Sequence, residues 1–203
     1  MKIICIGRNY AEHAAELHNP LPTEPIVFLK PDTAVLREGK PFFIPDFSNE
    51  VQYELEVVLK IAKRGKYIQP QFAHTYYQEI GLGIDFTARD LQNKLKNNGH
   101  PWEISKAFDS SAVVGDFLDK STFADVNNLH LQLRVNDHVR QDAKTSACIF
   151  GFDEIISYVS QFFTLAVGDL VYTGTPAGVA AVRPNDVLEG YLEGKKLLHC
   201  AIK

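Results

Sequence analysis

The chain has 203 residues, of which 21 are Lys or Arg and 25 are Asp or Glu, so its formal net charge at pH 7 is −4. This length predicts one domain with a full hydrophobic core, spanning residues 1–203. The slight negative charge excludes a general attraction to nucleic acid or anionic membranes, and the apolar runs are too short to span a bilayer.

Most of the chain carries short apolar runs, many of them alternating with polar residues, that predict β-strands. The predicted strands are residues 2–6, 26–30, 42–44, 54–62, 80–85, 129–135, 138–140, 170–173, 187–192 and 197–202. Asn136-Asp137 and residues 193–196 are typical of tight turns, so two hairpins are expected.

Four shorter segments have helical spacing, at residues 10–17, 70–78, 87–97 and 153–163. Asn9 with Glu12, and Thr87 with Asp90, have the spacing of capping boxes at two of the helix starts. The last segment is expected to pack one apolar face on the sheet. This face contains Ile155, Ile156, Val159, Phe162 and Phe163. The expected fold class is therefore α+β, dominated by β structure with a few short helices.

The three cysteines, Cys5, Cys148 and Cys200, are widely spaced and lie among apolar residues. Their odd number and spacing do not fit a disulfide framework or a zinc site. They predict reduced core thiols in a cytoplasmic protein.

Three acidic residues are the best candidates for a metal site. Glu54 and Glu56 are two apart in a predicted strand, so their side chains share one face. Asp85 ends another predicted strand, beside a loop where a ligand can be met. Carboxylates crowded together repel one another unless a cation lies between them, and Mg²⁺ or Mn²⁺ prefers such oxygen ligands. The alternative is an ordinary solvated strand face for the two glutamates, with Asp85 as a turn residue.

Two further groups could carry proton chemistry. His13 and Glu16 are three apart on a predicted helix, where a carboxylate can orient an imidazole that acts as a base. Lys106 lies among apolar and aromatic residues, so a fixed ammonium could stabilise an enolate or bind a carboxylate. The simpler alternatives are a surface His–Glu contact and a lysine whose head reaches solvent.

Residues 173–179, Thr-Gly-Thr-Pro-Ala-Gly-Val, follow a predicted strand. The glycines permit close backbone approach, and threonine hydroxyls can donate to a substrate carboxylate. The segment lacks the Gly-Lys-Ser/Thr end of a phosphate-binding P-loop, and a simple turn remains an alternative.

In this order, residues 7–13, 28–31, 54–56, 85–90 and 173–179 resemble the fumarylacetoacetate hydrolase family, in particular its small single-domain branch of acylpyruvate hydrolases. The resemblance extends from residue 3 to about residue 187. It implies a mixed β-sandwich roll of the type found in the C-terminal domain of that family, assembled as a homodimer. One departure is Gln52-Tyr53, where many relatives have a histidine shortly before the first metal-binding glutamate.

The resemblance also implies the roles of individual residues. Glu54, Glu56 and Asp85 would hold Mg²⁺ or Mn²⁺, to which a 2-oxo acid binds. His13, oriented by Glu16, would activate water, and Lys106 would stabilise an enolate. By resemblance, the expected substrate contacts are Gln141 and Thr175. Arg8, Tyr10, Arg89 and the segment 97–102 are expected to contribute to an acyl pocket.

The leading functional hypothesis is therefore a metal-dependent hydrolase that cleaves the carbon–carbon bond of an acylpyruvate, such as fumarylpyruvate or acetylpyruvate, to pyruvate and a carboxylic acid. Oxaloacetate decarboxylation, tautomerisation, and isomerisation of an unsaturated 2-oxo diacid are alternatives that use the same enolate chemistry. A non-catalytic protein that binds a 2-oxo acid or a protein partner is a third possibility. No basic stripe or known motif supports nucleic-acid binding.

Overall fold

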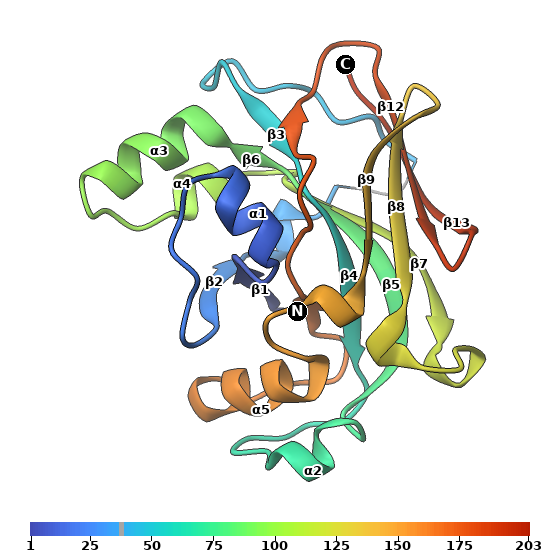
Figure 1. Cartoon of the computed structure of the whole chain (residues 1–203). Coiled ribbons are helices and arrows are strands. Elements are labelled where there is room, and N and C mark those ends of the chain that lie inside the picture. Colours follow the sequence, from blue (N-terminus) through green and yellow to red (C-terminus); the bar gives the residue numbers. More distant parts are fainter. Residues whose placement is uncertain (37–38) are drawn as a thin grey trace.

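The computed structural model describes residues 1–36 and 39–203, and β-strands dominate it (Figure 1). The larger sheet has the strand order β2-β1-β10-β4-β5-β7. Its strands are β1 (Ile3–Gly7), β2 (Ile26–Lys30), β4 (Leu55–Ile61), β5 (Tyr77–Asp85), β7 (Ala112–Asp119) and β10 (Leu170–Tyr172). Strand β1 pairs with β10 in parallel, whereas its pairing with β2 is antiparallel, so the sheet is mixed.

Two smaller sheets complete the architecture. One has the order β13-β12-β8-β9, formed by β8 (His130–Val135), β9 (His138–Lys144), β12 (Val187–Leu192) and β13 (Lys195–Ala201). The other has the order β11-β3-β6, formed by β3 (Val51–Tyr53), β6 (Thr87–Ala88) and β11 (Ala180–Ala181). The predicted mixed, β-dominated sandwich with few helices is confirmed.

The core lies between the six-stranded and four-stranded sheets, which lie side by side in Figure 1. Leu55, Val57 and Leu59 point from β4 into this core and are essentially without exposed surface. They belong to the same apolar cluster as Leu131 and Leu188 from the facing sheet. Because side chains alternate along a strand, Glu54, Glu56 and Val58 face the other way.

The helices are short and lie at the edges of the sheets (Figure 1). They are α1 (Ala11–Glu16), α2 (Pro70–Ala73), α3 (Arg89–Asn97), α4 (Glu103–Lys106) and α5 (Phe152–Phe162). In the part of the chain that the structure describes, 3₁₀ turns span Asp32–Ala34, Lys120–Thr122, Val126–Asn128 and Thr145–Ala147. Helix α5 buries Ile155, Ile156 and Val159 as predicted, but Phe162 is 57% exposed and does not belong to the packed face.

The two predicted hairpins are confirmed by their turns. Asn136 and Asp137 have φ of 50° and 65°, and Glu193 and Gly194 have φ of 49° and 75°. Positive φ at both central residues is the feature of the tight turns that match the twist of antiparallel strands. Strand pairs β8–β9 and β12–β13 are therefore joined as the sequence predicted.

Some predicted elements are wrong. The helix predicted over residues 70–78 ends at Ala73, because Tyr77 is buried in β5 and pairs with Ile61. The predicted strand 42–44 is reduced to a single bridge between Phe42 and Ile202. Strands β3, β6, β7 and β11 and helix α4 were not predicted.

Neither predicted capping box forms. The N-cap position of helix α1 is Tyr10, which makes no side-chain capping bond, and the Asn9 side chain bonds instead to the backbone of Phe150 and Thr173. Thr87 belongs to β6, and Asp90 accepts hydrogen bonds from a separate loop. In both cases a tertiary contact uses the side chain that local spacing had assigned to a cap.

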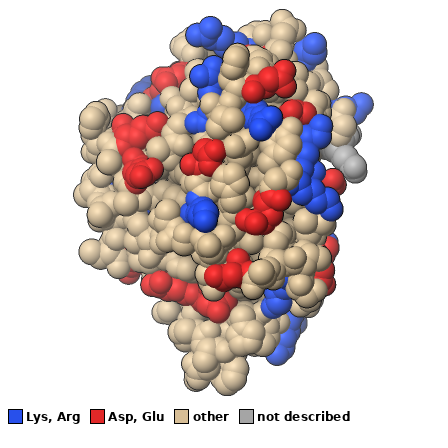
Figure 2. All heavy atoms as spheres, turned by 45° about the vertical axis from the view of Figure 1, so that its right-hand side comes forward, with Lys and Arg blue, Asp and Glu red and all other residues tan. Residues whose placement is uncertain are grey.

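Acidic and basic side chains are interspersed on the face shown in Figure 2, without a broad patch of one sign. Across the described ranges 1–36 and 39–203, none of the helices has the length and apolar character needed to cross a bilayer.

Candidate metal centre and cleft

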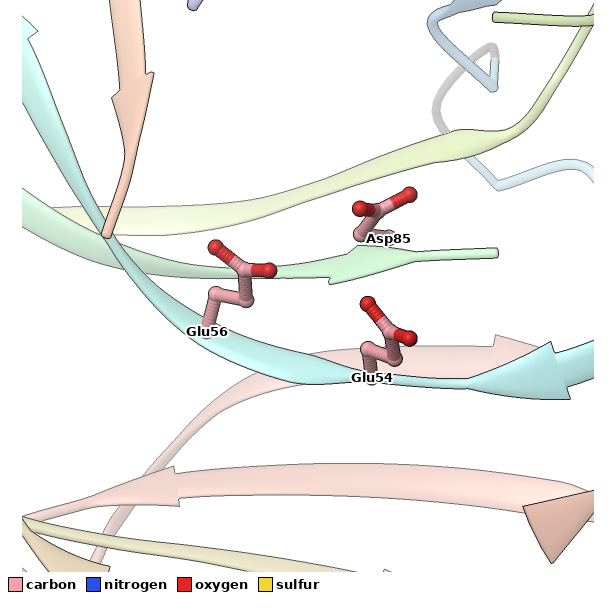
Figure 3. Close-up of side chains that lie close together, drawn as sticks. All are labelled: Glu54, Glu56 and Asp85. Carbon is pink, nitrogen blue, oxygen red and sulfur yellow. The ribbon is translucent and has the colours of Figure 1, made fainter. Parts of the chain in front are cut away.

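Glu54, Glu56 and Asp85 come together as predicted (Figure 3). One carboxylate oxygen from each lies within 4.8 Å of the others. The three residues are only 5%, 2% and 0% exposed, so the alternative of a solvated strand face is wrong. Three buried carboxylates this close together require a cation in or beside the site.

Strand geometry explains how the three carboxylates meet. Glu54 immediately precedes β4 and Glu56 lies within it, two residues apart on one face. The neighbouring strand β5 ends at Asp85, and Glu56 is paired with Gly83 in the β4–β5 register. The Asp85 amide donates to the Glu54 carbonyl at 2.9 Å, which fixes the two strand ends against each other.

Lys106 provides a cation to this centre from the end of α4. Its Nζ lies 2.6 Å from Glu54 Oε2 and 2.7 Å from Asp85 Oδ2, and it donates to Thr87 Oγ1 at 2.6 Å. Lys106 is 3% exposed, so the alternative of a lysine whose head reaches solvent is wrong. The expected fixed ammonium is present.

Lys30 is a second buried cation at this centre, and it was not predicted as a site residue. Its Nζ lies 2.8 Å from Asp85 Oδ1, with neither side chain exposed. The same ammonium donates to Ser111 Oγ at 2.9 Å and to the Lys106 carbonyl. Lys30 Nζ is close enough to Asp85 Oδ1 for an ion pair, but the angles between them are not those of a hydrogen bond. Within the described residues, Asp85 Oδ1 is therefore buried without a hydrogen-bond donor.

Arg89 also contacts the centre, from the start of α3. Its Nη2 donates to Glu54 Oε1, its Nη1 to Gln92 at 2.6 Å and its Nε to Gln52 at 2.7 Å. Each of the three guanidinium nitrogens therefore donates to a neighbouring side chain. Gln52, the residue that departs from the family pattern, thus orients the arginine that pairs with the first glutamate.

The surrounding charges separate the protonation of the two glutamates. Burial favours the neutral form of both, but Lys106 and Arg89 lower the pKa of Glu54 below its usual range. Burial, Asp85 and Glu54 together raise the pKa of Glu56 well above its usual range. Although burial opposes it, Asp85 and Glu54 raise the pKa of Lys106, which keeps the ammonium charged.

These features fit a hard divalent cation. All three candidate ligands offer carboxylate oxygen, which Mg²⁺ and Mn²⁺ prefer. Asp85 Oδ1 has no hydrogen-bond donor, and Glu56 has no ion-pair partner among residues 1–36 and 39–203. A cation bound here would give Asp85 Oδ1 a further contact and Glu56 a partner of opposite charge.

The predicted His13–Glu16 pair is formed on α1. His13 is 5% exposed, and its Nδ1 lies 3.1 Å from Glu16 Oε2. A carboxylate can only accept, so Nδ1 carries the hydrogen and Nε2 keeps its lone pair. Glu16 Oε1 also accepts from the Gly178 amide at 3.0 Å, which ties the helix to the loop of residues 173–179.

The same loop supports Glu56. The Gly174 amide donates to Glu56 Oε2 at 2.6 Å. Gly174 has φ of +99°, and a Cβ there would lie 2.6 Å from Asn9 Cβ, so only glycine fits. The close backbone approach inferred from the sequence thus serves to hold a carboxylate.

A cavity of about 420 Å³, which includes its opening to solvent, surrounds the centre. Predicted site residues that line it are Arg8, His13, Glu54, Glu56, Asp85, Arg89, Lys106 and Thr175. Trp102, from the segment 97–102 expected at the acyl pocket, also lines it. Gln92 and Lys96 line it too and were missed, although their helical spacing from Arg89, three and seven residues on, is a signal that could have found them.

Tyr10 and Gln141 are not among the cleft-lining side chains. Tyr10 is 3% exposed and lies beside Cys148. Gln141 accepts from the Leu55 amide at 2.9 Å and donates to Thr175 Oγ1 at 2.8 Å. Gln141 therefore positions Thr175 and the start of β4, and direct substrate contact by either residue stays a prediction.

The fold and cleft define a class of proteins in which a mixed β-sandwich carries a buried three-carboxylate centre beside a His–Glu pair and a fixed lysine. Residues 2–202 match the family described as fumarylacetoacetate (FAA) hydrolase C-terminal. The chain belongs to the fumarylacetoacetate hydrolase family, as the sequence resemblance indicated.

Three relatives illustrate the chemistry within this family. The oxaloacetate tautomerase FAHD1 of Bos taurus, mitochondrial by name, is 41% identical over 192 residues, or 95% of this chain and 87% of that protein. A mitochondrial oxaloacetate decarboxylase of Dictyostelium discoideum is 38% identical over 194 residues, covering 95% and 89%. The fumarylpyruvate hydrolase of Pseudomonas aeruginosa, solved with Mn²⁺ and pyruvate, is 35% identical with a TM-score of 0.93, covering 100% and 89%.

Proposed function

We propose that this protein is a divalent-metal-dependent tautomerase of oxaloacetate or a closely related 2-oxo dicarboxylic acid. Sequence reasoning placed acylpyruvate hydrolysis first and oxaloacetate chemistry second. The 41% identity to an oxaloacetate tautomerase supports the reverse order. The structural observation that carries the proposal is the presence of an oriented imidazole and a fixed ammonium in one cleft.

Glu54, Glu56 and Asp85 are the residues that would hold Mg²⁺ or Mn²⁺. The bound ion would supply Lewis acidity that polarises the 2-oxo group. The side chains around the centre supply the rest of the chemistry, because interconversion of keto and enol forms requires only the movement of a proton.

His13 is suited to take that proton from the carbon next to the 2-oxo group. Burial lowers the pKa of His13, although the charge of Glu54 and the hydrogen bond that His13 donates to Glu16 oppose the shift. The imidazole is therefore neutral at pH 7, with Nε2 free to accept. When the carbon–hydrogen bond breaks, its electrons form the carbon–carbon double bond of the enol and the carbonyl π electrons move to the oxygen. The protonated His13 then passes the proton to that oxygen, and the reverse sequence converts enol to keto.

Lys106 is suited to stabilise the negative charge that develops on that oxygen. Its ammonium is held by Glu54, Asp85 and Thr87, so it stays charged and needs little reorganisation during the reaction. Hydrolysis of an acylpyruvate is a second candidate, because the His13–Glu16 pair could also deprotonate water and a fumarylpyruvate hydrolase shares this fold.

The test is the rate at which enol-oxaloacetate absorbance decays to the keto form, with and without Mg²⁺. The wild type is expected to accelerate the decay, and His13→Gln to lose about 10²- to 10⁴-fold of that rate. Cleavage of fumarylpyruvate and of acetylpyruvate is assayed in parallel, as is the release of pyruvate from oxaloacetate by decarboxylation. Cleavage of an acylpyruvate without acceleration of tautomerisation would return the assignment to the hydrolase.

A further inference from the structure

The cleft contains four cationic side chains that fall into two groups. Arg89 and Lys106 are engaged by the carboxylates of the metal centre. Arg8 and Lys96 also line the cleft, yet neither has a carboxylate within 4.0 Å among the residues that the structure describes. Two positive charges in one cleft therefore have no carboxylate partner among residues 1–36 and 39–203.

We propose that Lys96, together with Arg8, forms an anion subsite in the outer part of the cleft that binds the carboxylate at the far end of a 2-oxo dicarboxylic acid. This inference rests on the proposed function and narrows its substrate class. The 2-oxo end of the substrate would lie at the buried carboxylate centre, and the far end would reach the two half-buried cations.

Helix α3 directs Lys96 toward the cleft. Arg89, Gln92 and Lys96 are spaced by three and four residues, so they share one face of the helix. All three line the same cavity. Lys94, which lies off this face, is exposed and does not line it.

Lys96 is fixed in place by a neutral partner. Its Nζ donates to Asn19 Oδ1 at 2.9 Å, from the segment between α1 and β2. An amide oxygen orients the ammonium without cancelling its charge. Burial, followed by the nearby charges of Arg8 and Arg89, lowers the pKa of Lys96, as expected for cations gathered without an anion.

Arg8 is also held in one arrangement. Its guanidinium lies over the Trp102 ring, 5.9 Å from the centroid. Its backbone has φ of 58°, the left-handed region that non-glycine residues seldom adopt, beside the three side-chain hydrogen bonds of Asn9. The chain thus maintains a strained residue at the point where its side chain faces the cleft.

The other cations do not offer an equivalent site. Each nitrogen of the Arg89 guanidinium already donates to a side-chain oxygen. Lys106 is enclosed by Glu54, Asp85 and Thr87. A carboxylate remote from the reacting carbon would therefore gain charge-assisted hydrogen bonds at Lys96 and Arg8, which form no ion pair with any residue that the structure describes.

The test uses two stable 2-oxo acids of equal length. 2-Oxoglutarate has a carboxylate at its far end, and 2-oxopentanoate has a methyl group there. Their dissociation constants are measured by calorimetry in the presence of Mg²⁺ for the wild type, Lys96→Met, Arg8→Met and the control Lys94→Met. The wild type and the control are expected to prefer 2-oxoglutarate at least tenfold, and each subsite variant to lose about tenfold of that preference.

Equal binding of the two acids by the wild type, or an undiminished preference in both subsite variants, would overturn the subsite. The outcome is separate from that of the proposed function, because binding is measured without turnover. A protein that keeps the Lys96-dependent preference but does not accelerate oxaloacetate tautomerisation would retain the subsite and lose the proposed reaction. A protein that accelerates oxaloacetate tautomerisation but shows no preference for 2-oxoglutarate would retain the proposed reaction and lose the subsite.

Discussion

Lys30 and Asp85 form an ion pair that is closed to solvent on both sides, with Nζ 2.8 Å from Oδ1 and no exposed surface on either side chain. The ammonium is held in addition by Ser111 and by the Lys106 carbonyl. Asp85 is thereby placed between two lysines, since Lys106 contacts its other oxygen. The position of this candidate metal ligand thus depends on a residue that does not line the cleft.

Substitution Lys30→Met is therefore expected to destabilise the fold. Removing one partner of a buried ion pair leaves the other charge poorly compensated, at a cost of about 3–5 kcal/mol. The free energy of unfolding is measured by urea denaturation without metal.

The matched control for this change is Lys60→Met. Lys60 and Glu79 form a pair of similar length, 2.7 Å, but their side chains are 40% and 41% exposed. Exposed pairs contribute about 0–1 kcal/mol, so the control is expected to change little. Equal losses in the free energy of unfolding of Lys30→Met and Lys60→Met would show that the buried ion pair stabilises the fold no more than the exposed one.

Lys30 also shows which site residues could not be predicted from the sequence. Glu54 and Glu56 could be placed on one face from alternation alone, because that relationship is local to one strand. Burial of Lys30 depends on Ser111 and α4, which lie far along the chain and approach β2 only in the folded state. The family motif contained Lys30, but nothing in the local sequence distinguishes it from a lysine at the exposed end of a strand.

In the fold, too, features that depend on a few neighbouring residues were predicted, whereas features that depend on long-range packing were not. Hairpins were predicted because turn chemistry and alternation act over a few residues, as at Asn136-Asp137. Tyr77 was assigned to a helix by spacing, yet it forms part of β5 because pairing with β4 buries its ring. Thr87 was assigned to a helix cap, yet its hydroxyl contacts Lys106. Long-range packing replaced the local preference in both cases.

Metal binding is expected to stabilise the protein through the three carboxylates. An ion that binds only the folded state adds about 2.7 kcal/mol to the free energy of unfolding at 100 times its Kd. Mg²⁺ or Mn²⁺ should therefore raise the melting temperature of the wild type. Glu56→Gln, which keeps the shape of a side chain that is 2% exposed, should abolish the rise, whereas the exposed Glu79→Gln should not. A metal-dependent rise that persists in Glu56→Gln would place the ion elsewhere.

Gly83→Ala is expected to disturb the metal centre through the strands β4 and β5 that carry its carboxylates. A Cβ at Gly83 would lie 2.5 Å from the Tyr172 ring, which has no exposed surface and donates to the Val113 carbonyl at 2.7 Å. The ring has nowhere to move without breaking that bond, so we expect a loss of about 1–3 kcal/mol in the free energy of unfolding.

Because Gly83 pairs with Glu56 across β4 and β5, Gly83→Ala should also weaken Mg²⁺ binding. Gly99→Ala is a control for adding a methyl group, since nothing lies within 4 Å of a Cβ there, although its φ of +66° adds a backbone cost of its own. Unchanged metal affinity in Gly83→Ala would show that the strand pair tolerates the displacement of Tyr172.

The pH dependence of turnover is expected to report on His13. Burial lowers the pKa of His13 below its ordinary value of 6.5, and only the neutral imidazole can accept a proton. As the pH falls, activity should therefore persist through pH 6.5 and be lost at a lower midpoint. The hydrogen bond that His13 donates to Glu16 raises the pKa of His13, so Glu16→Gln should move this midpoint lower still. The measurement is kcat/KM for oxaloacetate against pH; a midpoint above 6.5, or one that rises in Glu16→Gln, would remove His13 from the role of base.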